Sequence, residues 1–464
     1  MSAYVLAAGR DRPDHPALIV PGIGNWPHAA LLEAVERRAG GFAALGLPAG
    51  SRILLRLGNT VDFPVTFLAA CAADLVPVPT AAGLTVPEIT AMAARLSPAA
   101  VVAEAGLSVP EGACPIRPSA LDAPPLRWAD WPRRTAERLG YIVFTSGSGG
   151  RPKAVAHAHR AILARRMMWD GWYGLRPQDR MLHAGAFNWT FTLGTGLLDP
   201  WSIGATAIVP QDGTPIPALA DLLRQTGATL FAAVPGVFRK MLREPMGALP
   251  ALRHGLAAGE RVSDALRSDW RAATGTDMHE ALGMSECSTF ISGAPTRPAP
   301  PGTVGWPQTG RRVRIADGRL QIATDDPGLM LGYWEGDGPI PPNGDWFDTG
   351  DLVRRGPEEA LIHEGRADDL LNPGGYRVSP QEVEAALSGL PVQELAIGTV
   401  KTPSGATLLA AFYVGPELDE TAADAHAADR LAPFKRPRLW VRRESLPRNA
   451  NGKLLRQALA GDGA

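Results

Sequence analysis

The stretch YIVFTSGSGGRPK (141–153) joins a short apolar run to a loop of glycines and hydroxyl residues. The run 141–144 is rich in β-branched and aromatic residues and predicts a buried strand. In the loop, glycines let backbone N–H groups converge into a nest that binds anions, and Lys153 adds a point charge suited to phosphate. A Gly/Ser linker is the alternative, but linkers rarely follow a core strand directly. The stretch therefore predicts a phosphate-binding loop.

This loop differs from the Walker A pattern of kinases and other NTPases. That pattern has four residues between its glycines and ends in Gly-Lys-Ser/Thr. Here Pro152 precedes Lys153, and no hydroxyl residue follows the lysine. A Walker-type enzyme, which would release phosphate, is therefore disfavoured.

Length and composition are those of an ordinary globular protein. The 464 residues are about three times the ~150 of a typical domain, so two or three folding units are expected. The formal net charge of −1 gives no indication of nucleic acid or membrane-surface binding. Three widely spaced cysteines fit neither a disulfide framework nor a zinc site, and reduced thiols in a cytoplasmic protein are expected. Neither a signal peptide nor a membrane span is predicted.

Apolar strand-like runs alternate with helical patterns along the chain. A helix is predicted over 31–47 and a strand over 51–59, and the ranges 63–80 and 86–104 each predict a helix followed by a strand. A further helix is expected over 157–173. Later strands are expected at 181–187, 204–210, 228–235 and 254–260. Such continuous apolar runs are typical of parallel strands buried on both faces. The chain should therefore have an α/β fold, with ligands bound beyond the carboxyl ends of the strands.

Five segments occur in an order that matches a known family. They are TSGSGGRPK (145–153), AAGERV (257–262), HEALGMSEC (279–287), WFDTGDLVRR (346–355) and LPRNANGK (446–453). Together they resemble the acyl-adenylate-forming enzymes, which include acyl-CoA synthetases, luciferases and peptide-synthetase adenylation domains. The stretch 194–209 looks most like the benzoate-CoA ligase side of that family. GLMLGYWEG (328–336) resembles the family's Gly-Tyr-Trp stretch and is expected to be structural.

The resemblance implies an ATP site built from strand ends. Glu286 would hold Mg²⁺ that bridges phosphate oxygens, with the hydroxyl of Ser285 beside it. Asp351 would accept hydrogen bonds from the ribose hydroxyls, and Arg366 would contact ribose or phosphate. The segment around Gly259 would pack against adenine. The implied ATP- and AMP-binding residues are Thr145, Ser146, Gly147, Ser148, Gly149, Gly150, Lys153, Gly259, Glu260, Leu282, Gly283, Asp351 and Arg366.

The resemblance also implies an acyl pocket near the strand end at 185–196. Its lining residues would be Phe187, Asn188, Trp189, Gly283 and Trp306, with core packing as the alternative for Trp189. Peptide-synthetase domains usually carry Asp at the position of Asn188, so an amino acid substrate is disfavoured. Gly283 stands where acetate-specific members place a Trp that blocks the pocket. An aryl acid or a short- to medium-chain acid is therefore expected.

The C-terminal part would supply a catalytic lysine and a thiol-facing surface. Lys453 would bridge the carboxylate and phosphate oxygens while acyl-AMP forms and pyrophosphate leaves. Asp368 falls at the family's hinge, which divides the chain into an N-terminal adenylation domain (1–367) and a mobile α+β C-terminal domain (368–464). Rotation about the hinge would remove the lysine and bring in the surface that meets coenzyme A. The residues expected on that surface are Gly374, Gly375 and Arg377.

The implied activity is that of an ATP-dependent acyl-CoA ligase whose partners are a small carboxylic acid and coenzyme A. Two alternatives remain: an adenylating enzyme that loads a separate carrier protein, and a nucleotide-binding protein without catalysis. Leu282 replaces a usual aromatic residue and Gly149 a usual hydroxyl residue, which slightly favours the inactive homologue. Against it stand the retained residues Lys153, Glu286, Asp351, Arg366 and Lys453. The sequence is compatible with a homodimer.

Overall fold

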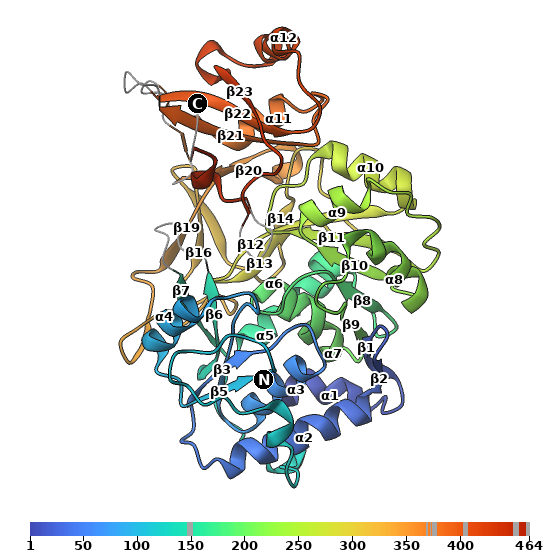
Figure 1. The fold of residues 1–464 in the computed structure, drawn as a ribbon, viewed down its shortest axis with the longest axis vertical. Coiled ribbons are helices and arrows are strands. Elements are labelled where there is room, and N and C mark those ends of the chain that lie inside the picture. The colour runs from blue at the N-terminus through green and yellow to red at the C-terminus, as the bar shows by residue number, and fades with distance from the viewer. Residues whose placement is uncertain are drawn as a thin grey trace.

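The computed structural model describes residues 1–145, 152–367, 370–371, 373, 378–401, 407–448 and 454–460. Most of the chain forms a large body, and the C-terminal elements form a smaller one above it (Figure 1). Within these described ranges, no helix combines the length and the apolar character needed to cross a membrane.

The N-terminal region contains a small parallel sheet in the order β4-β3-β5. Its strands are β3 (Arg52–Arg56), β4 (Val76–Pro79) and β5 (Ala100–Ala103). The helices of this region are α1 (Ser2–Arg10), α2 (His28–Ala44), α3 (Asp62–Ala72) and α4 (Val86–Leu96). Every residue of α3 except Asp62 is buried, as expected for a helix covered on all sides. Helix α4 begins with a capping box between Thr85 and Glu88. The predicted alternation of helices and strands is confirmed here.

The largest sheet has nine strands in the order β14-β13-β12-β11-β10-β8-β9-β1-β2. The run from β12 to β1 is parallel throughout, and the pairs at both edges are antiparallel. The strands are β1 (Pro16–Val20), β2 (Gly24–Pro27), β8 (Arg180–His183), β9 (Thr206–Ile208), β10 (Leu230–Ala233), β11 (His254–Ala258), β12 (Asp277–Met284), β13 (Ser288–Ser292) and β14 (Trp306–Pro307). The four later strands predicted from apolar runs are therefore present, each shorter than expected.

Helices cover both faces of this sheet (Figure 1). On β10, Phe231 packs with helices α8 (Leu219–Thr226), α9 (Pro235–Met241) and α10 (Asp264–Thr274). Its neighbours Leu230 and Ala232 face the other side, together with Trp172 and Phe191. That second side carries η3 (Trp169–Tyr173), α6 (Thr190–Leu193), η4 (Gly194–Leu198) and α7 (Asp199–Ser202). The result is a helix–sheet–helix sandwich, which leaves the strand ends free for a site.

The chain after the predicted phosphate loop differs from expectation. Instead of one helix over 157–173, strand β7 (Lys153–Ala158) returns antiparallel to β6 (Leu139–Thr145), and short helices α5 (Ala161–Ala164) and η3 follow. All of 154–158 is buried, so its small residues pack on both faces of a sheet. Alanine and histidine look helical by sequence, but β-pairing and burial override that preference.

The remaining strands belong to three further sheets. One joins β6 and β7 to β17 (Gly332–Glu335) and β18 (Gly338–Ile340). Another contains β15 (Val313–Ala316), β16 (Arg319–Ala323), β19 (Trp346–Arg355) and β20 (Leu361–Arg366). The C-terminal part has its own sheet of β21 (Glu394–Lys401), β22 (Thr407–Val414) and β23 (Leu439–Arg442), flanked by α11 (Pro380–Ala386) and α12 (Glu420–Arg430). That sheet and its helices enclose separate apolar cores.

Candidate active site

Glu286 lies in the tight turn between β12 and β13, and two contacts fix it. Its side chain is almost completely buried, with the residue 6% exposed. The hydroxyl of Tyr333 donates to Glu286 Oε1 at 2.7 Å, and the backbone N–H of Met330 donates to the Glu286 carbonyl at 2.7 Å. Burial, followed by the negative charge of Glu286, raises the pKa of Tyr333. The phenol therefore stays protonated and acts as the donor.

His157 supports the same turn from β7. Its Nε2 lies 2.7 Å from the carbonyl oxygen of Ser285, and its ring stacks on Tyr141 with centroids 4.8 Å apart. Burial lowers the pKa of His157 to about 4, so the imidazole is neutral and Nε2–H is the donor to that carbonyl. Ser285 and Glu286 are thus held by groups from two different strands, β7 and β17.

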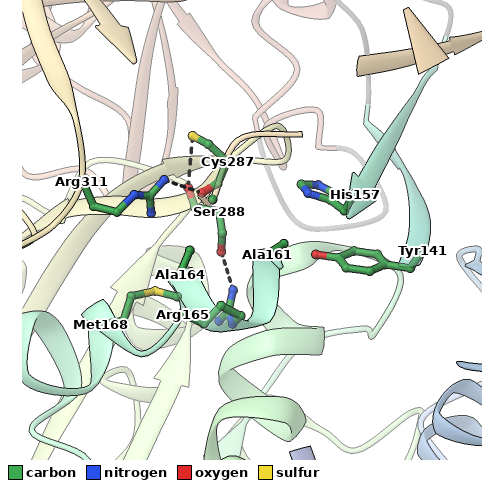
Figure 2. Close-up of a pocket in the computed structure, with 10 residues that line it drawn as sticks. Tyr141, His157, Ala161, Ala164, Arg165, Met168, Cys287, Ser288 and Arg311 are labelled. Carbon is green, nitrogen blue, oxygen red and sulfur yellow. Dashed lines mark hydrogen bonds between the residues drawn. The ribbon is translucent and has the colours of Figure 1, made fainter. Parts of the chain in front are cut away.

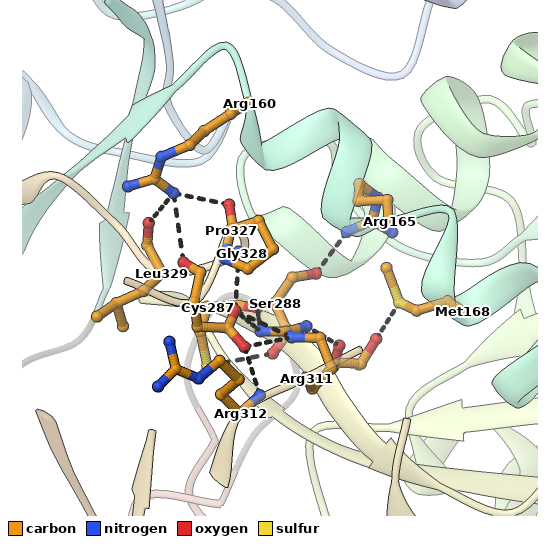
Figure 3. Close-up of polar contacts among 12 residues, drawn as sticks. Arg160, Arg165, Met168, Cys287, Ser288, Arg311, Arg312, Pro327, Gly328 and Leu329 are labelled. Carbon is orange, nitrogen blue, oxygen red and sulfur yellow. Dashed lines mark hydrogen bonds and ion pairs between the residues drawn. The ribbon is translucent and has the colours of Figure 1, made fainter. Parts of the chain in front are cut away.

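A buried ion pair holds the far side of the turn (Figure 3). Arg311 Nη2 donates to the Cys287 carbonyl at 3.1 Å and Nη1 to the Thr289 carbonyl at 3.0 Å. The Arg311 Nε lies 3.0 and 3.1 Å from the two carboxylate oxygens of Asp326. The two side chains are only 1% and 0% exposed. This pair fixes the backbone at the start of β13, where the chain leaves Glu286.

A very small cavity lies beneath Cys287 (Figure 2). Its volume is about 10 Å³, and its walls include Tyr141, Arg165 and Met168. Such a space holds about one water molecule, so it is not a substrate pocket. Burial raises the pKa of the Cys287 thiol, and the residue is a packed core group instead of a nucleophile.

Lys153 stands at the start of β7, beside the tyrosine that holds Glu286. Its side chain is exposed, and Nζ lies 4.7 Å from the centroid of the Tyr333 ring. Thr145 pairs with it across the hairpin. Lys153, Tyr333 and Glu286 therefore form a continuous row from the predicted phosphate loop to the turn.

Asp351 and Arg366 face each other on paired strands β19 and β20. The Arg366 Nη1 lies 4.0 Å from Asp351 Oδ1, and His363 Nε2 lies 3.1 Å from the same oxygen. After burial, the charges of Glu286 and Asp351 each raise the pKa of Cys287, so both carboxylates lie within electrostatic range of that thiol. The structure thus brings Asp351 and Arg366 together on paired strands.

Trp189 and Gly259 meet in the segments that follow β8 and β11, two parallel strands with β10 between them. Gly259 has φ of +94°, and a Cβ there would lie 3.4 Å from the Trp189 ring. The indole N–H of Trp189 donates to Thr192 Oγ1 at 2.6 Å, and its ring packs edge-on against Phe191 at 5.4 Å. This arrangement places the implied acyl pocket directly beside the implied adenine segment.

Other predicted pocket residues lie elsewhere. Phe187 is buried and stacks on Phe63 at 4.9 Å, away from the Trp189 cluster. Trp306 donates to the Glu358 carbonyl at 2.9 Å and lies under the Arg297 guanidinium at 3.5 Å. These contacts place Phe187 in the core and Trp306 beside a surface turn, and they do not support a role in closing the pocket.

Backbone packing explains the glycine at 283. Residues 282 and 283 pair with β13, where the register shifts. A Cβ on Gly283 would lie 2.5 Å from both the Ser288 carbonyl oxygen and the Thr289 Cα. The close approach of β13 therefore requires glycine for a reason that does not involve the substrate.

Several predicted residues fall outside the described part of the chain. They are Ser146, Gly147, Ser148, Gly149, Gly150, Asp368, Gly374, Gly375, Arg377 and Lys453. The expectations for them remain predictions.

Four contributors were not anticipated from the sequence: His157, Arg311, Asp326 and Tyr333. Tyr333 belongs to a stretch expected to be only structural, yet its hydroxyl contacts Glu286. The alternation of side chains along a strand could have indicated this role. Gly332 and Trp334 are buried, so Tyr333 between them faces the opposite side of the strand. The other three act through partners that are distant in sequence.

Comparison with known proteins gives a consistent family. A family model described as AMP-binding enzyme matches residues 6–334. The 4-hydroxybenzoate–CoA/benzoate–CoA ligase of Rhodopseudomonas palustris is 29% identical over 93% of this chain and 88% of its own. The benzoate–CoA ligase of Thauera aromatica is 28% identical over 93% of this chain and 90% of its own.

Solved structures agree with these sequence matches. A benzoate CoA ligase from Burkholderia xenovorans superposes with a TM-score of 0.85 at 26% identity, covering 99% of each chain. An anthranilate CoA ligase in complex with anthranoyl-AMP gives a TM-score of 0.88 at 22% identity, covering 99% of this chain and 96% of its own. The second match supports the fold, which is that of the acyl-CoA synthetases as predicted.

Proposed function

The chain belongs to the AMP-binding enzyme family, and on that premise we propose that it is an ATP-dependent aryl-CoA ligase. It activates an aromatic carboxylic acid as acyl-AMP with release of pyrophosphate, then transfers the acyl group to coenzyme A with release of AMP. The observation that carries the proposal is the row Lys153–Tyr333–Glu286 at the strand ends, with Asp351 nearby. The aryl-CoA ligases matched over 93% of the chain support the same reaction.

The residues of this row fit Mg²⁺ bound together with ATP. Among the described residues, no group of three His, Cys, Asp or Glu side chains could hold a metal alone. A single buried carboxylate is the protein ligand expected where substrate phosphates supply most of the oxygens. Glu286 would hold the ion, which would offset negative charge on the departing pyrophosphate.

The protein must bring two anions together, the carboxylate of the acid and the α-phosphate of ATP. The attacking carboxylate is ionised at neutral pH, so no general base is needed. Lys153 meets phosphate at the loop, Asp351 orients the ribose, and Arg366 adds positive charge beside it. Lys453 bridges the carboxylate and the α-phosphate while the new bond forms.

We propose that the second step uses a different arrangement of the same chain. The boundary lies at Asp368, with an adenylation domain over 1–367 and a mobile domain over 368–464. Rotation there withdraws Lys453 and presents Gly374, Gly375 and Arg377 to coenzyme A. The separate sheet and cores of the C-terminal part support a unit that can move as one body.

The acid that this site favours is aromatic. Trp189 and Phe191 meet edge-on beside Gly259, and aromatic rings prefer such surfaces. Asn188 is neutral and cannot form an ion pair with the ammonium group of a substrate, which argues against an amino acid. Hydroxybenzoate and benzoate are substrates named for similar enzymes.

The deciding experiment measures pyrophosphate release from Mg·ATP across a panel of acids, each with and without coenzyme A. The panel contains acetate, butyrate, hexanoate, benzoate, substituted benzoates and amino acids. We expect release with benzoates, and acyl-CoA only when coenzyme A is present. Release without thioester would instead indicate a carrier protein as acceptor. An absence of release with every acid would contradict the ligase.

Replacing the catalytic lysine should separate the two half-reactions. Lys453→Ala is expected to lose acyl-AMP formation, because no other group bridges the two anions, yet to convert added acyl-adenylate and coenzyme A into thioester. Pyrophosphate release and thioester formation are measured separately. Equal loss in both assays would contradict the role given to Lys453.

A further inference from the structure

We infer that Arg448 is a positioning residue that ties the C-terminal part of the chain to the adenine-side strand end while acyl-AMP forms. This inference deepens the proposed function and rests on it. Its basis is a row of alternating charges that crosses between the two parts of the chain.

The row contains three arginines and two glutamates. Arg448 Nη1 lies 2.7 Å from Glu260 Oε1, and Arg448 Nη2 lies 2.9 Å from Glu394 Oε2. At one end, Arg239 Nη2 lies 3.0 Å from Glu260 Oε2. At the other end, Arg243 Nη2 lies 3.7 Å from Glu394 Oε1. We call these five residues the charge ladder.

The charge ladder crosses between the two parts twice, at the Arg448–Glu260 pair and at the Arg243–Glu394 pair. Arg239 lies on α9 and Arg243 just beyond it, while Glu260 follows β11. Glu394 is the first residue of β21, and Arg448 follows β23. The Arg448–Glu260 contact therefore joins the C-terminal part to the segment that follows the carboxyl end of β11, one residue after Gly259.

Partial burial makes these pairs stronger than ordinary surface pairs. The side chains of Arg448, Glu260 and Glu394 are 20%, 16% and 14% exposed. Salt screens such groups less than fully exposed ones. Arg448 uses one Nη for each glutamate, and the fork of a guanidinium can do this where a lysine ammonium meets only one carboxylate well.

Arg448 also lies five residues before Lys453, the proposed catalytic lysine, and begins the segment that carries it. It pairs with Leu454 in an antiparallel bridge, and Leu455 N donates to the Pro447 carbonyl at 2.8 Å. Lys453 directly precedes Leu454 in the chain. Holding Arg448 on Glu260 therefore holds both ends of this segment at the strand end where Trp189 and Gly259 meet.

The Arg448–Glu260 contact should affect the two half-reactions differently. Acyl-AMP formation requires Lys453 at the strand ends, so it requires the Arg448–Glu260 contact. Thioester formation follows a rotation that carries Arg448 away from Glu260. Loss of Arg448 should therefore slow the first step and leave the second unchanged.

The test compares three variants in two assays. Arg448→Gln removes the charge, Arg448→Lys keeps it, and Arg442→Gln is the matched control. Arg442 also lies in the C-terminal part, where its Nε donates to the Gly415 carbonyl at 2.9 Å. One assay follows pyrophosphate release with Mg·ATP and the preferred acid, and the other follows thioester formation from added acyl-adenylate and coenzyme A.

We expect Arg448→Gln to lower pyrophosphate release by about tenfold or more, because truncation leaves two shielded glutamates without their shared partner. Its thioester formation should equal that of the wild type. Arg448→Lys should recover part of the first rate, and Arg442→Gln should match the wild type in both assays.

Two results would overturn the inference: an equal decrease in both half-reactions, or unchanged pyrophosphate release in Arg448→Gln. A wild-type enzyme that releases no pyrophosphate with any acid would overturn the proposed function itself, and the role of Arg448 with it. The two failures are therefore distinguishable.

Discussion

Glu286 has its position because of groups that are distant from it in sequence. Tyr333 holds one carboxylate oxygen, and Met330 holds the backbone carbonyl. A nearly buried carboxylate needs protein donors in place of the water it has lost. The phenol supplies one and fixes the orientation of the carboxylate within the turn.

Tyr333→Phe tests the role of this hydrogen bond, because it removes only the phenolic hydroxyl. A hydrogen bond to a charged group contributes about 1.5–3 kcal/mol, so we expect pyrophosphate release to fall about tenfold or more and to need more Mg²⁺ for half-maximal rate. The measurement is a Mg²⁺ titration of pyrophosphate release. Tyr413→Phe is the control, since that hydroxyl accepts from Leu418 N in the C-terminal part. An unchanged Mg²⁺ dependence would contradict the assignment.

At the scale of single residues, the sequence predicts which residue types occupy the site better than it predicts why each one is there. Motif order indicated Glu286, Asp351 and Arg366, and the structure brings the last two together on paired strands. It did not indicate that Gly283 is required by the backbone of β13, because that contact depends on the register shift between the two strands. The contacts of Trp306 could not be predicted for a similar reason, since its partners come from other turns.

At the scale of elements, the turn between β12 and β13 is held by a buried ion pair. Arg311 reaches two carbonyls of that turn and strand, and Asp326 neutralises it. Asp326 also accepts from the N–H groups of Arg312 and Gly328. The pair thus connects the Glu286 turn to the segment that leads into β17 and Tyr333.

Asp326→Asn should destabilise the protein strongly. Breaking a buried pair leaves an uncompensated charge, which costs about 3–5 kcal/mol, and the free energy of unfolding is measured with urea. The double variant Arg311→Met/Asp326→Leu removes both charges and should recover part of this loss. It should not recover activity, because the carbonyls of the turn lose their donor. A double variant no more stable than the single one would contradict the explanation.

Four strands of the nine-stranded sheet, β8 to β11, were predictable because each lies in a continuous apolar run. Strand β7 was not, since alanine and histidine have no strong β preference. Its identity depends on pairing with β6 and on burial by neighbouring elements. Local sequence cannot reveal either cause.

At the scale of the whole molecule, six histidines, five of them buried and one half-buried, make folding sensitive to acid. Burial lowers the pKa of five of them to about 4 and that of His183 to about 3. The five are His28, His157, His159, His254 and His279. Each is neutral when folded and would bind a proton near pH 6.5 when unfolded.

Stability should therefore fall as the pH decreases from about 6.5 toward about 4. The unfolded state binds more protons in that window, so the free energy of unfolding decreases by up to about 1.4 kcal/mol per pH unit for each fully buried histidine. Urea unfolding at several pH values measures this slope. His157→Gln keeps a donor for the Ser285 carbonyl. It removes one proton taken up on unfolding, so the slope of the unfolding free energy against pH should decrease. A flat profile between pH 7 and 5 would contradict the prediction.

The division of the chain at Asp368 stays a prediction from the order of its motifs, and the way the two parts meet could not be predicted at all. Glu260 and Arg448 are separated by 188 positions, and neither carries a local pattern that indicates the other. Interfaces of this kind arise from tertiary packing, which periodicity and propensity do not encode.

The charge ladder also has an evolutionary consequence. Because Glu260 and Arg448 come from different parts of the chain, recombination between related genes could inherit one without the other. A C-terminal part taken from a relative would present its own residue to Glu260, and the hybrid could fold well yet catalyse the first step poorly. The two parts thus form a matched pair, and natural selection acts on their compatibility as well as on each separately.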